Sequence, residues 1–179
     1  MLEVICGPMY AGKTEELIRR LRRAVIARQR VQVFKPTIDR RYHATRITSH
    51  SEQSLDAQSV PDAATLRWAL LDGTQVVGID EAQFFGTPLV EVVEEAMARG
   101  QRVIVAGLDL DSNERPFEPL PHLLALADAV TKLAAVCVRC GQAATRSHRL
   151  STGTARIEVG GPKEYEALCG PCMRAARVA

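Results

Sequence analysis

The chain has 179 residues, 46% of them hydrophobic and 25% charged, which is the ordinary composition of a globular domain with at most a small appendage. Its 23 basic and 21 acidic residues leave a formal net charge of +2, too little to indicate a nucleic-acid partner. No apolar run approaches the roughly 20 residues of a membrane-spanning helix, which argues against an integral membrane protein.

The first predicted element is a short buried strand over residues 2–6. It leads directly into a glycine-containing loop, and it lacks the basic start and long apolar stretch of a signal peptide. Four of the five cysteines stand in metal-type pairs, and disulfides are rare in the cytosol. We therefore expect a cytoplasmic protein that binds neither a membrane nor a nucleic acid.

The segment after this strand matches the phosphate-loop pattern G-x-x-x-x-G-K-[ST] at every fixed position. Its two glycines allow backbone conformations that bring N–H groups onto phosphate oxygens, and the next helix adds its positive N-terminal end. Lys13 can reach the β- and γ-phosphates of ATP, and the Thr14 hydroxyl can bind Mg²⁺. The predicted nucleotide-binding residues here are Gly7, Pro8, Met9, Tyr10, Ala11, Gly12, Lys13 and Thr14.

An amphipathic helix is predicted next, over residues 15–30, with arginines on its exposed face. An apolar run over 31–34 predicts a second strand, and residues 61–71 predict a second helix. The predicted buried face of the first helix consists of Leu17, Ile18, Leu21 and Val25.

The third predicted strand, residues 76–79, is apolar and ends in two carboxylates, Asp80 and Glu81. In phosphate-loop proteins such a strand places an aspartate beside the loop, where it holds Mg²⁺. We predict this role for Asp80, whereas Glu81 points elsewhere and can accept the proton of an attacking hydroxyl or water. The alternative is that both carboxylates only cap a helix that begins nearby.

A third helix is predicted over residues 87–99, with Thr87 as its N-cap and Pro88 at its first position. A fourth apolar run, residues 103–108, predicts the next strand. Strands and helices thus alternate, and the strands are continuously apolar. This pattern predicts an α/β fold in which helices flank a parallel sheet.

The pattern changes near Ala135, which predicts a nucleotide-binding domain over 1–135 and a small zinc-binding domain over 136–179. Beyond this boundary C-x₂-C occurs twice, with 28 residues between the pairs, and Gly141 and Gly170 suit the tight turns of such a site. Four thiolates fill the tetrahedral shell of one Zn²⁺ and leave no position for a catalytic water, so we expect a structural zinc. Disulfides and a redox pair are the alternatives. The predicted ligands are Cys137, Cys140, Cys169 and Cys172.

Further short segments accompany these motifs in order along the chain: residues 35–36, 39–42, 49–50, 80–85, 107–109, 116–117 and 157–161, with Tyr165. Together with the phosphate loop and the cysteine pairs, they resemble the cytosolic, type II thymidine kinases. The resemblance covers nearly the whole chain, from Leu2 to Cys172. Each segment is a weak signal by itself, apart from the phosphate loop, but the ordered set is specific.

The resemblance implies transfer of the γ-phosphate of ATP to the 5′-hydroxyl of thymidine, giving thymidine monophosphate in nucleoside salvage. It also implies a homotetramer and feedback inhibition by thymidine triphosphate. The site residues that it implies are Glu81 as general base, Arg41 and Lys13 at the transferring phosphate, Thr14, Asp39 and Asp80 at Mg²⁺, and Asp80, Glu81, Ala82 and Gln83 beside the nucleotide.

In this family the thymine base is enclosed by a loop that the zinc domain holds, which corresponds roughly to residues 141–168 here. The domain over 136–179 is therefore expected to enclose the substrate. A base pocket needs apolar faces and polar edges, although each aromatic residue could equally pack in a core. Ser147 stands where the family usually has threonine. The predicted nucleoside-binding residues are Met9, Phe84, Leu108, Phe117, Ser147, Val159, Gly160, Gly161 and Tyr165.

One departure from the family pattern follows residues 109–111. The family usually has a phenylalanine and often an arginine there, whereas this chain has Ser112 and Asn113. The missing aromatic wall predicts weaker thymidine binding and adds deoxyuridine as an expected second substrate. A lost apolar contact costs only roughly 1–3 kcal/mol, so we expect activity to remain.

The rival hypothesis is a nucleic-acid-dependent ATPase, because residues 80–83 read Asp-Glu-Ala-Gln, as in helicases. The chain is too short for two motor domains, its net charge is small, and its zinc segment lacks a dense basic and aromatic surface. A non-catalytic zinc-binding module would leave the phosphate loop and Glu81 unexplained.

Overall fold

The computed structural model of the chain describes residues 1–38, 46–48, 54–151 and 163–178. Its centre is a six-stranded sheet with the order β5-β2-β6-β7-β1-β8, and every neighbouring pair in it is parallel. The predicted parallel sheet is thus confirmed. The strands are β1 (Leu2–Cys6), β2 (Val31–Pro36), β5 (Gln58–Val60), β6 (Val76–Ile79), β7 (Arg102–Gly107) and β8 (Ala129–Lys132).

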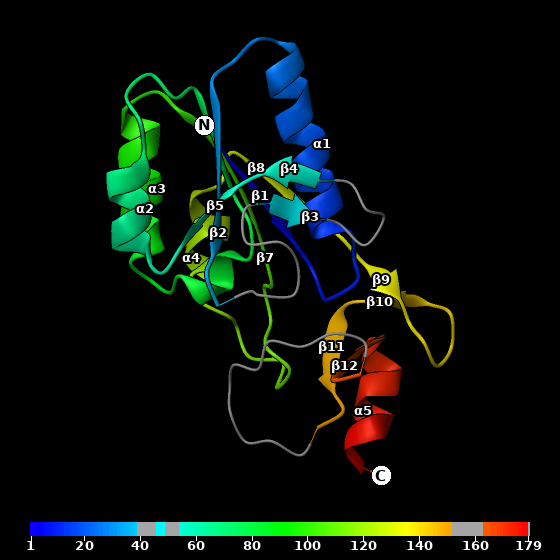
Figure 1. Cartoon of the computed structure of the whole chain (residues 1–179). Coiled ribbons are helices and arrows are strands. Elements are labelled where there is room, and N and C mark those ends of the chain that lie inside the picture. Colours follow the sequence, from blue (N-terminus) through cyan, green and yellow to red (C-terminus); the bar gives the residue numbers. More distant parts are fainter. Residues whose placement is uncertain (39–45, 49–53, 152–162, 179) are drawn as a thin grey trace.

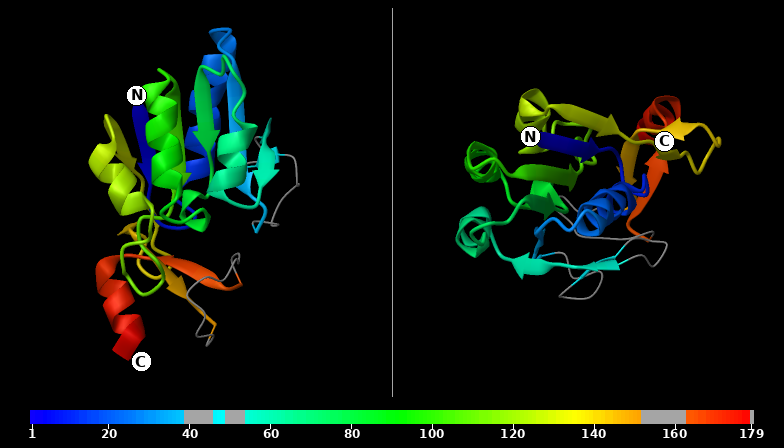
Figure 2. Two further views of the ribbon diagram at one scale, coloured as in Figure 1. Left: turned by 90° about the vertical axis from the view of Figure 1, so that its left-hand side faces the viewer. Right: turned by 90° about the horizontal axis from the view of Figure 1, so that it is seen from above.

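Helices cover both faces of this sheet (Figures 1 and 2). Helix α1 (Lys13–Ile26) lies on one face, and the opposite face carries α2 (Ala63–Ala69), α3 (Leu89–Ala98) and α4 (Leu120–Leu126). Each face has its own buried cluster of aliphatic side chains. The predicted α/β fold with flanking helices is therefore confirmed.

The register of α1 corrects one detail of the sequence prediction. Leu17, Ile18 and Leu21 are buried as expected, but the side chain of Val25 is 50% exposed and Ala24 is buried instead. The buried row therefore continues from Leu21 by a step of three residues, not four. The helix also ends at Ile26, before the predicted end at residue 30.

The start of α3 corrects a second detail. Its N-cap is Pro88, which makes no side-chain cap, so the prediction of Thr87 as N-cap was wrong. A tight backbone turn replaces the side-chain cap, because Leu89 and Val90 donate their N–H groups to the carbonyl oxygens of Gly86 and Thr87. Helix α2 does have a side-chain cap, in which Asp62 accepts the N–H of Thr65 at 2.7 Å.

The C-terminal region, from Ala135 onward, lies beyond the carboxyl ends of the sheet strands (Figure 1). It consists of two small antiparallel sheets and a final helix, packed around a cluster of mostly small side chains. A further antiparallel pair, β3 (Arg46–Thr48) and β4 (Ser54–Asp56), lies near α1. The C-terminal elements are β9 (Ala135–Val136), β10 (Ala143–Ala144), β11 (Arg146–Arg149), β12 (Tyr165–Leu168) and α5 (Gly170–Val178).

None of the helices in the described ranges is both long enough and apolar enough to cross a bilayer.

Candidate active site

The predicted phosphate loop lies between the end of β1 and the start of α1. Gly7 has a φ of 140°, and a Cβ at this position would lie 2.3 Å from the carbonyl oxygen of Leu133, so no other residue fits there. Gly12 has a φ of 81° and caps α1 without a side chain. The loop therefore presents backbone N–H groups and the positive end of α1, which is what a bound phosphate requires.

The lysine of the loop lies folded back across it. Lys13 Nζ donates a hydrogen bond to the carbonyl oxygen of Pro8 at 2.7 Å. The ammonium group is thus held over the loop that would cradle the phosphates. It can exchange this carbonyl for a phosphate oxygen with a small rotation of its long side chain.

Asp80 lies directly beside this loop, because β6 is separated from β1 by only one strand, β7. The Thr14 hydroxyl donates to Asp80 Oδ2 at 3.0 Å. Burial of the Asp80 carboxyl, followed by the charge of Glu81, raises its pKa to about 7, although the Thr14 hydrogen bond acts in the opposite sense. A divalent cation next to this carboxyl would favour its ionised form, so the Thr14–Asp80 pair fits Mg²⁺.

Glu81 has a left-handed backbone, with a φ of 49°. It precedes a short 3₁₀ helix, η1 (Ala82–Phe84), but its side chain makes no capping hydrogen bond to that helix. The capping interpretation of Glu81 therefore fails. A non-glycine residue in this conformation is uncommon and is found disproportionately at functional sites.

Gln83 forms a hydrogen bond with the Glu81 carboxylate. The sequence had predicted only a contact with the nucleotide for this residue. Its amide nitrogen donates to Glu81 Oε2 at 2.5 Å, and its amide oxygen accepts the N–H of Leu108 at 3.0 Å. Gly107 leaves room for this amide, since a Cβ there would lie 2.8 Å from Gln83 Oε1. Gln83 therefore joins the ends of β6 and β7 and orients Glu81. Ala82, also predicted beside the nucleotide, is fully buried in the core.

The phosphate loop also contacts the C-terminal region directly. The Met9 N–H donates to Ser147 Oγ at 3.0 Å, and the Tyr10 hydroxyl donates to the carbonyl oxygen of Tyr165 at 3.2 Å. The Ser147 oxygen accepts here, so its own proton remains available for a second hydrogen bond. These contacts bring the predicted nucleoside residues Met9, Ser147 and Tyr165 together at one end of the phosphate loop.

Three more of the predicted pocket residues are described: Phe84 follows β6, Leu108 follows β7, and the Phe117 N–H donates to the Asp109 carbonyl oxygen at 3.0 Å. Phe84 and Leu108 are half-buried, whereas Phe117 is buried. The predicted residues Asp39, Arg41, Val159, Gly160 and Gly161 lie outside the described residues.

The four paired cysteines form one cluster at the base of the C-terminal region. Their ligand atoms all lie within 4.8 Å of one another, and none of them forms a disulfide. Although burial opposes ionisation of Cys137, the backbone N–H groups of Cys169, Arg139 and Cys140 lower its pKa to about 6. Cys172 shows the opposite shift, because hydrogen bonds with the Cys169 and Cys140 sulfurs raise its pKa to about 12.

The geometry of this cluster fits a metal site. Four thiolates at this distance repel one another, and a dication is the group that allows all of them to ionise together. Cys172 lies within α5, which begins at Gly170, so Gly170 starts a helix and does not form the turn predicted for it. Gly141 has a φ of 74° and does form one.

The fifth cysteine, Cys6, lies at the end of β1 and is fully buried. Burial, with a smaller contribution from the Asp109 carboxylate, raises its pKa to about 11, which makes it an unreactive core thiol. Asp109 is itself paired with Lys132 at the end of β8, at 2.7 Å. The sequence did not reveal this pair, because the two residues are adjacent only across the sheet.

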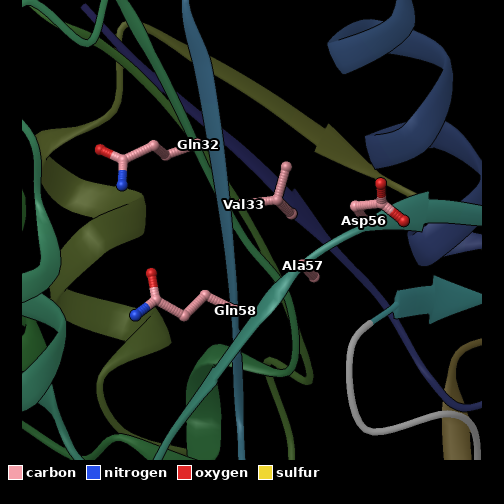
Figure 3. Close-up of a pocket in the computed structure, with 5 residues that line it drawn as sticks. All are labelled: Gln32, Val33, Asp56, Ala57 and Gln58. Carbon is pink, nitrogen blue, oxygen red and sulfur yellow. The ribbon is translucent and has the colours of Figure 1, made fainter.

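One cavity of about 500 Å³ lies away from these groups, at the β5 edge of the sheet (Figure 3). Its polar side chains do not converge, because Gln32 and Asp56 lie on opposite sides of strand β2 (Figure 3). The Gln32 amide already binds Ala69, Leu71 and Thr74 through its oxygen and nitrogen. The cavity is therefore not a candidate for the chemistry.

Comparison with known proteins gives consistent matches over both regions of the molecule. The family model described as "Thymidine kinase" matches residues 1–173. A thymidine kinase of Rhodothermus sp. (strain ITI 518) is 52% identical over 176 residues, which cover 98% of this chain and 82% of that protein. A thymidine kinase of Porphyromonas gingivalis (strain ATCC 33277) is 50% identical over 97% of this chain and 84% of its own length. One of Bdellovibrio bacteriovorus is 51% identical over 94% of this chain and 82% of its own length.

Proposed function

The chain belongs to the thymidine kinase family, and from this premise we propose that it transfers the γ-phosphate of ATP to the 5′-hydroxyl of thymidine. The product is thymidine monophosphate, made by salvage of the nucleoside. The observation that carries the proposal is the proximity of the phosphate loop, the Thr14–Asp80 pair and Glu81 at one edge of the sheet.

Each of these groups has a defined part in the reaction. The backbone N–H groups of the loop bind the phosphates of ATP, except at Pro8, which has none, and Met9, which donates to Ser147. Lys13 and Arg41 offset the charge on the group being transferred. Thr14 and Asp80, with Asp39, would hold Mg²⁺, which supplies further neutralisation when bound. Glu81 accepts the proton of the 5′-hydroxyl, and its hydrogen bond from Gln83 keeps the carboxylate aimed in one direction.

The nucleoside binds between the carboxyl edge of the sheet and the C-terminal region. Apolar faces come from Met9, Phe84, Leu108 and Phe117, and the Ser147 hydroxyl is one polar contact. Residues 159–161 and Tyr165 complete the pocket on this proposal. A Zn²⁺ held by the four cysteines keeps the region folded without taking part in the transfer.

The chain then has a nucleotide-binding domain over 1–135 and a zinc-binding domain over 136–179 that encloses the substrate. Family membership supports a homotetramer and feedback inhibition by thymidine triphosphate. The free thiols of the cysteine cluster suit the reducing cytoplasm. We expect no role for a nucleic acid.

A substrate panel tests the function. Phosphate transfer from ATP is measured to thymidine, deoxyuridine, deoxycytidine and deoxyguanosine, with single-stranded RNA added separately as a possible stimulant of ATP hydrolysis. We expect transfer to thymidine. We also expect transfer to deoxyuridine, at a lower kcat/KM, because Ser112 replaces an aromatic wall of the pocket and so makes acceptance of a second nucleoside easier. If no nucleoside is phosphorylated and RNA stimulates hydrolysis, the kinase proposal fails and the helicase-like alternative replaces it.

A further inference from the structure

A single carboxylate joins the loop after β7 to two elements of the C-terminal region. Glu114 Oε1 lies 2.6 Å from Arg146 Nε on β11, and Glu114 Oε2 lies 2.8 Å from Arg177 Nη1 on α5. Each carboxylate oxygen is thus used by a different element. We call Glu114, Arg146 and Arg177 the Glu114 clasp.

The loop that carries Glu114 is internally braced. The buried Asp111 carboxylate accepts the N–H groups of Asn113 and Arg115, each at 2.9 Å. An isolated bridge pairs Leu110 with Pro116. These contacts brace the loop in one conformation, so a contact at its tip bears on the placement of residues 108–117.

Glu114 occupies the tip in a conformation that its residue type disfavours. Its φ is 60°, in the left-handed region, which non-glycine residues rarely adopt. Local turn geometry alone would favour glycine or asparagine at this position. A glutamate here brings a charge to the tip of the loop, and that charge meets two arginines of the C-terminal region.

The two sides of the clasp carry different walls of the proposed pocket. On the loop side, Leu108 and Phe117 stand at the two ends of the segment. On the other side, Arg146 is the immediate neighbour of Ser147, whose hydroxyl accepts the Met9 N–H. The spacing between these walls is therefore linked to the distance between Glu114 and Arg146.

We propose that Glu114 is a positioning residue that sets the width of the nucleoside pocket. It does so by joining the pocket residues on the loop after β7 to those on the C-terminal region. This inference rests on the proposed function, because it assigns the clasp to binding of the nucleoside acceptor. Glu114 touches neither the phosphate loop nor Glu81 by any contact seen in the described residues. Its effect is therefore on the KM for thymidine and not on kcat or on the KM for ATP.

The test compares Glu114→Gln with a matched control. Glu95→Gln removes an ion pair of 2.9 Å with Arg67 between α3 and α2, on the face of the sheet far from the C-terminal region (Figure 1). We expect Glu114→Gln to raise the KM for thymidine about threefold to tenfold, the range for a partly exposed ion-pair cluster, and Glu95→Gln to leave it unchanged. Added NaCl should raise the KM of the unaltered protein toward that of Glu114→Gln, which should itself respond little.

A second variant separates positioning from folding. Glu114→Gly removes the clasp but tolerates the left-handed backbone, so its melting temperature should stay close to that of the unaltered protein. We expect it to show the same rise in KM as Glu114→Gln. If the KM for thymidine is unchanged in both variants while the unaltered protein turns over normally, the role proposed for Glu114 is wrong and the proposed function stands. Absence of thymidine phosphorylation by the unaltered protein would instead reject the proposed function and, with it, this role for Glu114.

Discussion

The two buried clusters of the sheet consist largely of leucine, isoleucine, valine and phenylalanine side chains. The cluster of the C-terminal region instead contains three alanines and two of the paired cysteines among its buried residues, with one leucine and one methionine. Alanine buries little apolar surface, so this cluster yields much less hydrophobic stabilisation than the sheet. We therefore expect the sheet to fold on its own core and the C-terminal region to depend on a metal at the cysteine cluster.

The proposed function assigns different steps to these two regions. Of the groups proposed for phosphate transfer, Lys13 begins α1, and Asp80 and Glu81 directly follow β6. On the same proposal, recognition of the acceptor depends on the C-terminal region, which carries Ser147 and Tyr165. We therefore expect that chemistry and recognition can be disturbed separately.

Removing the metal should have the largest effect. Structural zinc contributes about 10–16 kcal/mol to the folding of small zinc-binding peptides, so chelation under reducing conditions should unfold the C-terminal region. We expect limited proteolysis to cut after residue 135 while the sheet stays intact, and thymidine phosphorylation to be lost. Elemental analysis before chelation should find about one zinc per chain. Cys6→Ala is the control, because Cys6 lies outside the cysteine cluster. Cleavage within the sheet would contradict the expectation that the sheet folds without the metal.

Glu81→Gln should abolish most turnover without affecting the C-terminal region. Loss of a general base lowers kcat by about 10²–10⁴-fold, and the amide keeps the shape of the side chain. Binding of ATP, followed by calorimetry, and the KM for thymidine should change little. Glu94→Gln, an exposed glutamate on α3, serves as the control. Unchanged turnover would exclude Glu81 as the base.

Glu3→Gln should weaken the sheet alone. Glu3 is 6% exposed and pairs with Arg102 at 2.6 Å and Arg20 at 2.8 Å. Removing one partner of a buried ion pair costs about 3–5 kcal/mol, and we expect the lower end because Arg102 is partly exposed. Denaturant unfolding at neutral pH measures this loss, and zinc content should not change.

The pH dependence of Glu3 gives the same test a second readout. Burial raises the pKa of this carboxyl, but the hydrogen bonds and charges of Arg102 and Arg20 outweigh burial and lower it below 4.5. A folded-state pKa below the unfolded value means that the stabilisation is present above about pH 4.5 and is lost as the pH falls through the folded value. Glu3→Gln should therefore unfold with a shallower dependence on pH in this range. An identical acid slope in both proteins would count against the assignment.

Ser112→Phe should have the smallest effect, on recognition only. Restoring one apolar contact is worth roughly 1–3 kcal/mol, so we expect the KM for thymidine to fall by about tenfold with kcat unchanged. The ratio of kcat/KM for thymidine and deoxyuridine reports whether the new ring contacts the base. Asn113→Phe adds the same ring at the exposed neighbouring position and is the control. An equal response of the two variants would show that Ser112 does not face the pocket.

Some elements were predictable because their signals are local. The runs over 2–6 and 76–79 coincide with β1 and β6, since a strand buried on both faces is continuously apolar. Strands β5 and β8 and helix α4 were not predicted. Both strands lie at the edges of the sheet, where the exposed positions interrupt any apolar run.

Within the candidate site, too, some residues were predictable from the sequence and others were not. The glycines and Lys13 of the phosphate loop were predictable because their short spacing along the chain limits their geometry. The four cysteines were predictable because two C-x₂-C pairs supply the four ligands of one tetrahedral Zn²⁺. The role of Gln83 was not, since its partner Leu108 lies 25 residues away in the sequence. Nothing in the pattern around Gln83 distinguishes a contact with the nucleotide from support of Glu81.

The sequence by itself determined the α/β class, the phosphate loop, the acidic pair after β6 and the clustering of the cysteines. The phosphate loop and the acidic pair each depend on residues within one turn or one short motif, where covalent connection limits the possible distances. The α/β class and the pairing of the two C-x₂-C motifs follow from patterns that repeat along the chain. Only the tertiary structure decided that Met9 meets Ser147 across 138 positions, and that Glu114 meets Arg146 and Arg177. Such contacts depend on how the C-terminal region packs against the edge of the sheet, and that packing is the sum of many weak interactions that no local pattern records.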